Sequence, residues 1–268
     1  MPRRARLDAE LVRRGLARSR EHASQLVADG RVTIRGTVAT KPATAVELDT
    51  ALVVRETDDP NWASRGAHKL VGALARFPDI AVEGRRCLDA GASTGGFTDV
   101  LLRGGARQVV AADVGRGLLD WRLRTDDRVV VKDKTNVRAL TPEDIGGPVD
   151  LVVADLSFIS LRLVLPALAA CLDEGGDLLP MVKPQFEVGK ERLGSGGVVR
   201  DPELRAEAVL DVVAAAAAIG LRLHGVTASP LPGPSGNVEF FAWLRRGEPV
   251  DAEAAGAMVR AAVAEGPR

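Results

Sequence analysis

The spacing of apolar residues changes along the chain, and the change comes near residue 60. Before it, Leu7 and Leu11 stand four residues apart and Gly15 follows, which predicts a short amphipathic helix with a glycine stop. A second helix is expected to begin after Ser19, its N-cap, and to end at Gly30. Both helices are short, so this part of the chain predicts a small domain.

Strand signals follow the two helices. Residues 31–39 alternate between apolar and polar types around an Arg-Gly pair, which predicts a hairpin, and residues 51–55 predict a further strand. The adjacent acids and the proline that come next are typical of a linker. We therefore expect a small α+β domain over residues 1–59, a linker over 60–65 and a second domain over 66–268.

Beyond residue 84 the pattern becomes one of alternating strands and helices. The expected strands are 85–89, 108–113, 128–133, 150–155, 177–183, 221–229 and 239–246. Helical patterns intervene, among them 95–105, 160–172 and 201–220. Such alternation predicts an α/β fold with a seven-stranded, doubly wound, Rossmann-like parallel sheet that binds ligands at the carboxyl ends of its strands. The last two strands are expected to pair as a closing edge, and the tail 251–268 to form a helix on the sheet.

The composition is that of a soluble globular protein, with 268 residues, a formal net charge of +0, 46% hydrophobic and 27% charged residues. No apolar run approaches the roughly 20 residues of a membrane span, and no hydrophobic signal core begins the chain, so we expect a cytoplasmic protein without membrane contact. Cys87 and Cys171 lack metal-ligand spacing and are expected to be buried and reduced. His22, His68 and His224 lie far apart, so we expect no metal site.

Positive charge is concentrated at the start of the chain, where ten basic residues stand against four acidic ones between Met1 and Lys41. A basic patch on an otherwise balanced protein indicates a nucleic-acid partner, because phosphates are negatively charged. A solvated surface face would have the same composition. Charge alone does not separate these two interpretations.

The stretch Cys87–Phe97, CLDAGASTGGF, places a glycine-rich turn after the first strand of the expected sheet. A dinucleotide site would read Gly-x-Gly-x-x-Gly, and a phosphate loop would end in Gly-Lys-Ser/Thr, and neither pattern is present. Asp89 is expected at the strand tip, where a carboxylate repels a pyrophosphate and favours a cation. S-adenosyl-L-methionine carries a sulfonium and an ammonium and no phosphate, so it fits this turn best, with a purely structural glycine turn as the alternative.

Further polar residues at strand ends support an adenosine ligand. Asp113 ends the second strand of this sheet, where an acidic side chain in such folds binds both ribose hydroxyls. Asp133 or Asn136, just past the third strand, is expected to bond the adenine edge. The residues predicted to hold the cofactor are Asp89, Gly91, Ala92, Ser93, Thr94, Gly95, Gly96, Phe97, Asp113, Val114, Asp133, Asn136 and Asp155.

Four charged residues are expected to converge on the same strand ends. Asp155 and Lys183 end the fourth and fifth strands, Glu239 opens the last one, and Lys69 lies on a helix before the first. In this order they resemble the catalytic tetrad of FtsJ-type ribose 2′-O-methyltransferases, which implies a catalytic role for all four. A lysine near another cation can act as a base, whereas nearby carboxylates favour an ammonium that only orients the substrate. Both roles stay open, and each residue alone would also suit a surface, cap or edge position.

Other methyl acceptors fit the sequence less well. Methylation of a base amino group usually goes with an Asn/Asp-Pro-Pro-aromatic turn after the fourth strand, where this chain reads DLSF over Asp155–Phe158. Carbon methylation would use a cysteine, and neither cysteine is placed for it. Phe158 could stack on an extruded base or pack under the following helix, and the sequence does not decide between them.

The segment Arg6–Gly36 closely resembles the small RNA-binding domain first described in ribosomal protein S-four, and the resemblance covers about the first fifty residues. It implies that structured RNA is contacted mainly through its phosphates. The residues implied in RNA binding are Arg4, Arg6, Arg18, Arg20 and Lys41, together with Arg65, His68 and Phe158 of the second domain.

From Arg3 to about Arg246 the chain closely resembles the TlyA family, on the segments SRGAHKL, LDAGASTGGFTDVLL, VVADLSFISL, MVKPQFE and SPLPGPSGNVEFF. The resemblance implies S-adenosylmethionine-dependent 2′-O-methylation of cytidines in small- and large-subunit ribosomal RNA, and thereby susceptibility to capreomycin and viomycin. It implies ribosomal RNA within ribosomal subunits as the partner, and no obligate protein partner is evident. Related actinobacterial members have Arg-x-Trp where this chain has Pro60-Asn61-Trp62, so a linker-dependent coupling of RNA and cofactor binding is not implied here.

Two other functions stay open. A ribosome-docking protein with an idle cofactor fold would bind ribosomal RNA without methyl transfer, although the complete charged tetrad argues against it. A membrane-active hemolysin is suggested by the older name of the family, but no amphipathic stretch with a strong apolar face supports it.

Overall fold

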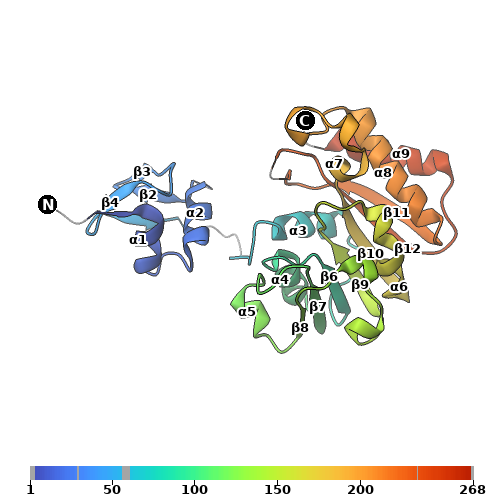
Figure 1. Cartoon of the computed structure of the whole chain (residues 1–268), viewed down its shortest axis with the longest axis horizontal. Coiled ribbons are helices and arrows are strands. Elements are labelled where there is room, and N and C mark those ends of the chain that lie inside the picture. The colour runs from blue at the N-terminus through green and yellow to red at the C-terminus, as the bar shows by residue number, and fades with distance from the viewer. Residues whose placement is uncertain (1–3, 29, 56–60, 234, 267–268) are drawn as a thin grey trace. The chain divides into compact units, whose positions relative to one another are not determined.

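The computed structural model describes residues 4–28, 30–55, 61–233 and 235–266. The chain divides into two compact units, Met1–Asn61 and Trp62–Arg268 (Figure 1). Each unit has its own hydrophobic core. The two are described separately below.

The smaller unit combines two helices with two small antiparallel sheets. Its helices are α1 (Leu7–Arg13) and α2 (Arg20–Ala28). Its strands are β1 (Arg4–Arg6) paired with β4 (Ala45–Glu47), and β3 (Thr37–Val38), β2 (Val32–Ile34) and β5 (Leu52–Val54) in that order. The hairpin, the strand after it and both helices are confirmed, whereas the β1–β4 pair was not predicted from the sequence.

Apolar spacing explains how this unit closes. Leu7 and Leu11 of α1 and Ala23 of α2 are fully buried in one core with Val32 of β2. The Ser19 hydroxyl accepts a hydrogen bond from the backbone N–H of His22 at 3.1 Å, so Ser19 caps α2 as expected.

The larger unit is built on a seven-stranded sheet in the order β11-β12-β10-β9-β6-β7-β8. The strands are β6 (Arg86–Ala90), β7 (Gln108–Ala112), β8 (Val129–Lys132), β9 (Val149–Ala154), β10 (Leu172–Val182), β11 (Leu221–Ala228) and β12 (Phe240–Arg246). Strands β6 to β10 run parallel, and β12 runs antiparallel to both β10 and β11. The count of seven strands and the pairing of the last two are confirmed. The sheet is mixed rather than wholly parallel, because β12 inserts between β10 and the edge strand β11.

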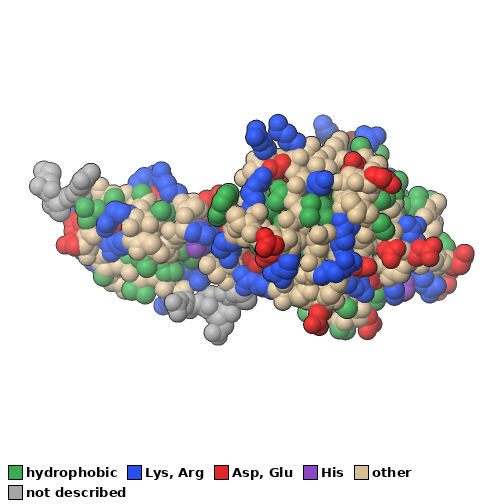
Figure 2. Space-filling model, turned by 90° about the horizontal axis from the view of Figure 1, so that it is seen from below, with side chains coloured by type: hydrophobic (Ala, Val, Ile, Leu, Met, Phe, Trp, Pro, Cys, Tyr) green, Lys and Arg blue, Asp and Glu red, His purple; other side chains and the backbone are tan. Residues whose placement is uncertain are grey.

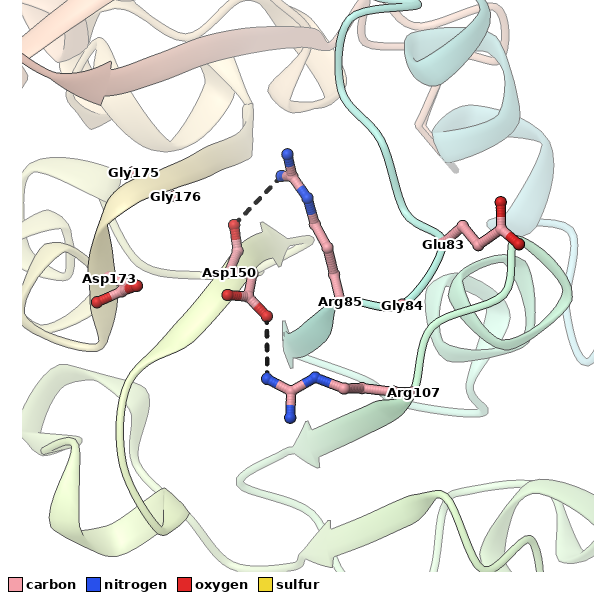
Figure 3. A pocket seen from close by; sticks show the side chains of 8 residues that line it. All are labelled: Glu83, Gly84, Arg85, Arg107, Asp150, Asp173, Gly175 and Gly176. Atoms are coloured by element: carbon pink, nitrogen blue, oxygen red, sulfur yellow. Dashed lines mark hydrogen bonds and ion pairs between the residues drawn. The ribbon is translucent and has the colours of Figure 1, made fainter.

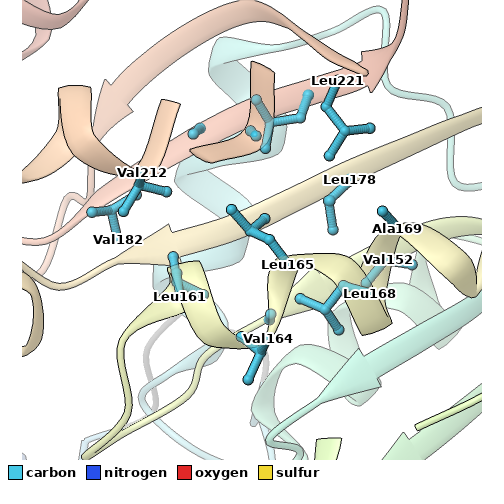
Figure 4. Close-up of a cluster of buried hydrophobic side chains, with 14 of the residues drawn as sticks. Val152, Leu161, Val164, Leu165, Leu168, Ala169, Leu178, Val182, Val212 and Leu221 are labelled. Carbon is cyan, nitrogen blue, oxygen red and sulfur yellow. The ribbon is translucent and has the colours of Figure 1, made fainter. Parts of the chain in front are cut away.

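Helices cover both faces of this sheet (Figure 1). They are α3 (Ala67–Arg76), α4 (Gly96–Arg103), α5 (Trp121–Arg124), α6 (Leu165–Ala170), α7 (Pro184–Glu187), α8 (Pro202–Ala217) and α9 (Ala252–Glu265). Alternate residues of one strand serve the two faces: Leu88 packs with α6 and α8, while Cys87 packs with α3 and α4. Figure 4 shows part of the first of these cores, with Leu165 and Leu168 of α6 against Val152 and Leu178 of the sheet.

Three local expectations have clear outcomes. The helix expected over 160–172 is shorter, because α6 ends at Ala170 and Leu172 already begins β10. The tail helix is confirmed as α9, which contacts α8 and β11. Both cysteines are buried as expected, and burial raises the pKa of the Cys87 thiol to about 12 and that of Cys171 to about 11.

Among the described residues, no helix is long and apolar enough to cross a membrane. Within the same residues, no group of three or more His, Cys, Asp and Glu side chains is arranged to hold a metal ion.

Candidate active site

The glycine turn after β6 is pinned to both neighbouring strands. The backbone N–H groups of Gly91 and Ala92 both donate to the carbonyl of Ala112, at the end of β7. Gly91 has φ of +88°, and a Cβ there would lie 2.6 Å from the carbonyl oxygen of Asp155, which follows β9. Only glycine fits this position, and the turn therefore brings the ends of β6, β7 and β9 together at one edge of the sheet.

Asp89 lies deeper than the sequence suggested. It is the fourth residue of β6 rather than its tip, it is fully buried, and its Oδ2 accepts a hydrogen bond from the Thr98 hydroxyl at 2.7 Å. Burial raises the pKa of Asp89 to about 7, which corrects the expectation of a plainly charged carboxylate. Its Oδ1 is buried and has no hydrogen-bond partner among the described residues, so this oxygen remains an open acceptor.

Asp113 shapes the same turn from β7. Its carboxylate accepts the N–H of Ser93 at 2.9 Å and that of Gly115 at 2.7 Å, while the carboxylate stays partly exposed. The next residue, Val114, exposes 70% of its surface. Asp113 is thus held at the strand end where the ribose contact was predicted, beside an uncovered apolar side chain.

The two residues predicted to reach an adenine have partners of their own. Asp133 forms an ion pair with Arg124 at 2.7 Å and accepts the N–H of Gly117 at 3.2 Å. The Asn136 side chain accepts the N–H of Arg138 at 3.1 Å and caps a short 3-10 turn. Each of these oxygens accepts one hydrogen bond and has a second lone pair, so a contact with adenine is compatible with these bonds and stays a prediction.

The four charged residues of the predicted tetrad form two ion pairs. Lys183 Nζ lies 2.6 Å from Asp155 Oδ1 and donates to the Ser157 hydroxyl at 3.0 Å. Lys69 Nζ, from the first turn of α3, donates to Glu239 Oε2 at 2.5 Å. The second oxygen of Glu239, Oε1, is buried without a hydrogen-bond partner among the described residues.

Strand register explains why these residues lie at one edge. Ala154 of β9 is paired with Pro180 of β10, and Val182 of β10 is opposite Phe240 of β12. Asp155 and Lys183 directly follow β9 and β10, and Glu239 directly precedes the antiparallel β12, so all three lie at the same edge. Helix α3 supplies Lys69. Both lysines and Glu239 are buried. Because a buried charge is tolerated only when it is paired, the fold requires these two ion pairs.

Comparison with known proteins identifies the family of each domain. The model of the FtsJ-like methyltransferase family matches residues 62–246, and that of the S4 domain matches residues 5–51. TlyA of Mycobacterium tuberculosis, a protein named 16S/23S rRNA (cytidine-2′-O)-methyltransferase, is 62% identical over 269 residues, which is 100% of each chain. The chain belongs to the TlyA family of FtsJ-like methyltransferases.

More distant members have the same organisation. Hemolysin A of Brachyspira hyodysenteriae is 34% identical over 88% of this chain and 98% of its own. The solved structure of a protein from Streptococcus thermophilus, named as a hemolysin, superposes with a TM-score of 0.77 and 38% identity. This superposition covers 99% of this chain and 96% of the other. The similarity to these two proteins therefore extends over both domains of this chain.

Phe158 stands out in the FtsJ-like domain. It is 92% exposed, which shows that packing under the next helix was the wrong interpretation. Its φ of +63° is uncommon for a residue with a side chain, and its ring lies 5.3 Å from that of Phe186, centroid to centroid. The exposed ring of Phe158 thus packs on the half-buried ring of Phe186, whose centre lies 5.9 Å from Lys183 Nζ.

The arginines predicted to bind RNA are oriented by acids of the S4 domain. Arg6 and Arg20 both bind Asp8, at 2.8 Å and 3.2 Å, and Arg4 lies 3.5 Å from Glu47. Their guanidinium groups stay exposed, whereas Asp8 is buried. The bond from Arg6 holds the pKa of Asp8 at about 2, so Asp8 remains charged.

The other residues predicted to contact RNA lie at the surface of their units. Arg18 donates to Asn61 at 3.5 Å, and Lys41 is exposed. Arg65 is exposed and His68 is half-buried, at the start of α3. These positions are accessible to RNA, and their contacts with it stay predictions.

Three residues at this edge were missed in the sequence. Thr98 holds Asp89, Ser157 holds Lys183, and the buried Glu187 accepts the N–H of Leu161 at 2.7 Å and the Ser160 hydroxyl. Glu187 thereby fixes the loop that carries Phe158. The spacing Asp-x₈-Thr across the turn could have indicated Thr98, whereas the contacts of Ser157 and Glu187 connect separate loops and leave no local pattern.

A cavity of about 460 Å³ lies at the opposite end of the strands. It is lined by Glu83, Gly84, Arg85, Arg107, Asp150, Asp173, Gly175 and Gly176 (Figure 3). Its arginines are already bound: Arg107 pairs with Asp150 at 3.2 Å, and Arg85 donates to the Asp150 carbonyl at 3.3 Å. Ligands of doubly wound sheets bind at carboxyl ends, so this cavity is not the candidate active site of the FtsJ-like domain.

Proposed function

We propose that this protein transfers a methyl group from S-adenosyl-L-methionine to the 2′-hydroxyl of cytidines in ribosomal RNA of the small and large subunits. The observation that carries the proposal is the pair of lysine–carboxylate ion pairs at the carboxyl edge of the FtsJ-like domain. Full-length similarity to the M. tuberculosis protein, which is named for this reaction, supports the substrate. A ribosomal substrate also supports action in the cytoplasm and an influence on capreomycin and viomycin susceptibility.

The residues at the carboxyl edge fit S-adenosylmethionine. The buried Oδ1 of Asp89 accepts no hydrogen bond from the described residues. A cationic ligand nearby would favour the charged form of this carboxylate. The turn from Gly91 to Gly96 presents backbone rather than bulky side chains, and Val114 offers an uncovered apolar surface beside Asp113. A pyrophosphate would meet these same acids with repulsion, which supports a sulfonium ligand over a dinucleotide.

S-adenosylmethionine, when bound, supplies a methyl group that its sulfonium already activates for in-line displacement. The protein must then hold the ribose oxygen about 3–3.5 Å from that carbon, and the hydroxyl proton passes to Glu239 Oε1, an open acceptor at this edge among the described residues. Lys183 donates one N–H to the Ser157 hydroxyl and forms an ion pair with Asp155 Oδ1. An ammonium has three N–H donors, so a further one can reach the ribose oxygen. We therefore assign Lys183 the role of orienting that oxygen and stabilising its developing negative charge.

Glu239 provides the complementary acceptor. Lys69 occupies Oε2, while Oε1 is buried and lacks a partner among the described residues. A hydroxyl donor of the substrate would satisfy this oxygen, and an unsatisfied buried carboxylate oxygen is otherwise costly. Lys69 orients Glu239, so we assign these two residues to positioning the ribose and its hydroxyl proton.

Phe158 and Phe186 are suited to hold the base of the target nucleotide. Aromatic rings beside a catalytic lysine can stack on a base that has left its helix, and stacking accepts an unpaired base far more readily than a paired one. The S4 domain supplies exposed arginines for the RNA phosphates, namely Arg4, Arg6, Arg18 and Arg20, with Lys41.

The proposal is tested with ribosomal subunits that lack the modification. Each subunit is incubated with the protein and a radiolabelled methyl donor, and modified positions are mapped from reverse-transcriptase stops at low nucleotide concentration. We expect label in cytidines of both RNAs and its loss when sinefungin, an unreactive analogue of the methyl donor, is added in excess. Binding of subunits without label would favour the docking module instead, and label on a base atom would overturn the assignment of the ribose.

A further inference from the structure

An exposed tryptophan lies outside the residues assigned above. Trp121, the first residue of α5, is 73% exposed, although tryptophan is usually well buried. Two further apolar side chains of the same segment, Val114 and Leu118, are also exposed. This is a concentrated apolar surface on a short stretch of chain, and the proposed chemistry does not use Trp121.

The segment that carries the tryptophan is packed on the glycine turn. Leu119 and Leu123 are buried, and a Cβ on Gly95 would meet their side chains at 2.7 Å and 2.3 Å. The N–H of Asp120 donates to the Thr94 carbonyl at 3.1 Å. Because Leu119 and Leu123 fill the core side of this segment, the side chain of Trp121 is directed outward.

The surroundings of Trp121 are basic. Arg116, Arg122 and Lys134 are exposed, and Lys134 is tied to this segment by its N–H, which donates to the Gly115 carbonyl at 2.8 Å. Arg122 pairs with Asp120 at 3.3 Å, but Arg116 forms no ion pair within the ranges that the structure describes. Figure 2 shows many Lys and Arg side chains on one face of the larger unit, interspersed with acidic ones.

We propose that Trp121, with Arg116, Arg122 and Lys134, is a second RNA-binding surface on which an unpaired base of the substrate RNA stacks while the cations hold the neighbouring phosphates. Stacking on an exposed aromatic ring beside exposed cationic side chains is how proteins hold single-stranded nucleic acid. The centre of a protein–protein interface is usually poor in charged residues, whereas three cationic side chains surround Trp121 here. The inference rests on the proposed function, because that function supplies the RNA.

The test compares four variants in equilibrium binding to ribosomal subunits and to the same RNA after removal of the proteins. Trp121→Leu keeps an apolar side chain but cannot stack, and we expect it to weaken binding to both by about tenfold. Trp121→Phe should retain most of the affinity. Leu163→Ala, which shortens another exposed apolar side chain of the same domain, should bind like the wild type. Arg116→Ala should lower the slope of log affinity against log salt by about one.

Three results would overturn the inference. If Trp121→Leu bound RNA with wild-type affinity, no base would stack on Trp121. A loss of affinity seen only with intact subunits would indicate a ribosomal protein as the partner. Reduced affinity of Trp121→Leu for sinefungin, measured by calorimetry, would assign Trp121 to the cofactor. Because binding needs no methyl transfer, a wild type that binds RNA but never transfers methyl would refute the proposed function and leave this surface standing.

Discussion

Acidic and basic side chains meet at both ends of the strands in the larger unit, and the two ends differ in how completely the charges are satisfied. At the amino end, Arg85 binds Asp177 at 2.5 Å and also the Asp150 carbonyl. Asp177 further accepts the indole N–H of Trp243 at 2.7 Å and lies 3.4 Å from Arg245. These groups have several partners each, so little binding capacity remains.

At the carboxyl end, polar atoms remain open. Asp89 Oδ1, Gln185 Oε1 and Glu239 Oε1 are buried without a hydrogen-bond partner among the described residues. Such atoms are costly in a folded protein unless a ligand satisfies them. The comparison teaches that incomplete hydrogen bonding, rather than the presence of a cavity or of charges, separates the candidate active site from the cavity of Figure 3.

The largest effect is expected from Lys183→Ala, which removes the group assigned to the ribose oxygen. Methyl transfer to subunits should fall by about a hundredfold to a thousandfold, the range typical of a lost hydrogen-bond donor to a developing negative charge, while binding of RNA stays intact. Initial rates with a radiolabelled methyl donor measure the transfer, and equilibrium binding to ribosomal subunits measures the affinity for RNA.

The matched control at the other end is Arg107→Ala. Its pair with Asp150 is exposed, and exposed pairs contribute between nothing and about 1 kcal/mol, so its transfer rate should stay within twofold of the wild type. Equal losses in the two variants would erase the distinction between the ends.

A second effect concerns stability. Lys69→Ala leaves Glu239 buried without a cation, and breaking a buried pair costs about 3–5 kcal/mol in the free energy of unfolding. Adding Glu239→Gln should recover part of that loss, because a neutral amide is less costly to bury than a lone carboxylate. Arg85→Ala should cost less, since Asp177 keeps Trp243 and Arg245. Urea denaturation of the four proteins measures these differences, and the ordering fails if Arg85→Ala is the most damaging.

The third effect is a pH dependence from Asp89. Its pKa is about 7 in the folded protein and about 3.9 in the unfolded chain, so the folded state holds this proton more tightly. Relative to Asp89→Asn, stability should therefore fall as pH rises from about 4 to 7, by up to about 4 kcal/mol, and stay constant above. Denaturation midpoints of both proteins across pH 5 to 8 measure this. Parallel profiles would show that Asp89 keeps an ordinary pKa.

Much of this architecture could be predicted from the sequence. Runs such as those around Val109 and Val152 are apolar because both faces of the sheet are covered, and each ends in a polar residue at the carboxyl edge. This regularity is enough to place Asp155 and Lys183 together, and the structure shows them as an ion pair.

The remainder depends on contacts between distant segments. Strand β1 has three residues, too few for a period, and exists because it pairs with β4. The depth of Asp89 depends on Thr98 and α4 covering it, and the exposure of Phe158 depends on Glu187 fixing its loop from another strand end. From its residue type alone, Trp121 would be expected in the core. The structure shows that Leu119 and Leu123 are buried instead and that Trp121 faces outward.

The ion pair between Lys69 and Glu239 joins residues 170 positions apart, and the second of them precedes the last strand. During synthesis, α3 leaves the ribosome long before β12 does, so a growing chain lacks half of this pair until translation is nearly finished. A chain that stops before residue 239 therefore lacks the carboxylate that Lys69 orients, and with it part of the candidate active site.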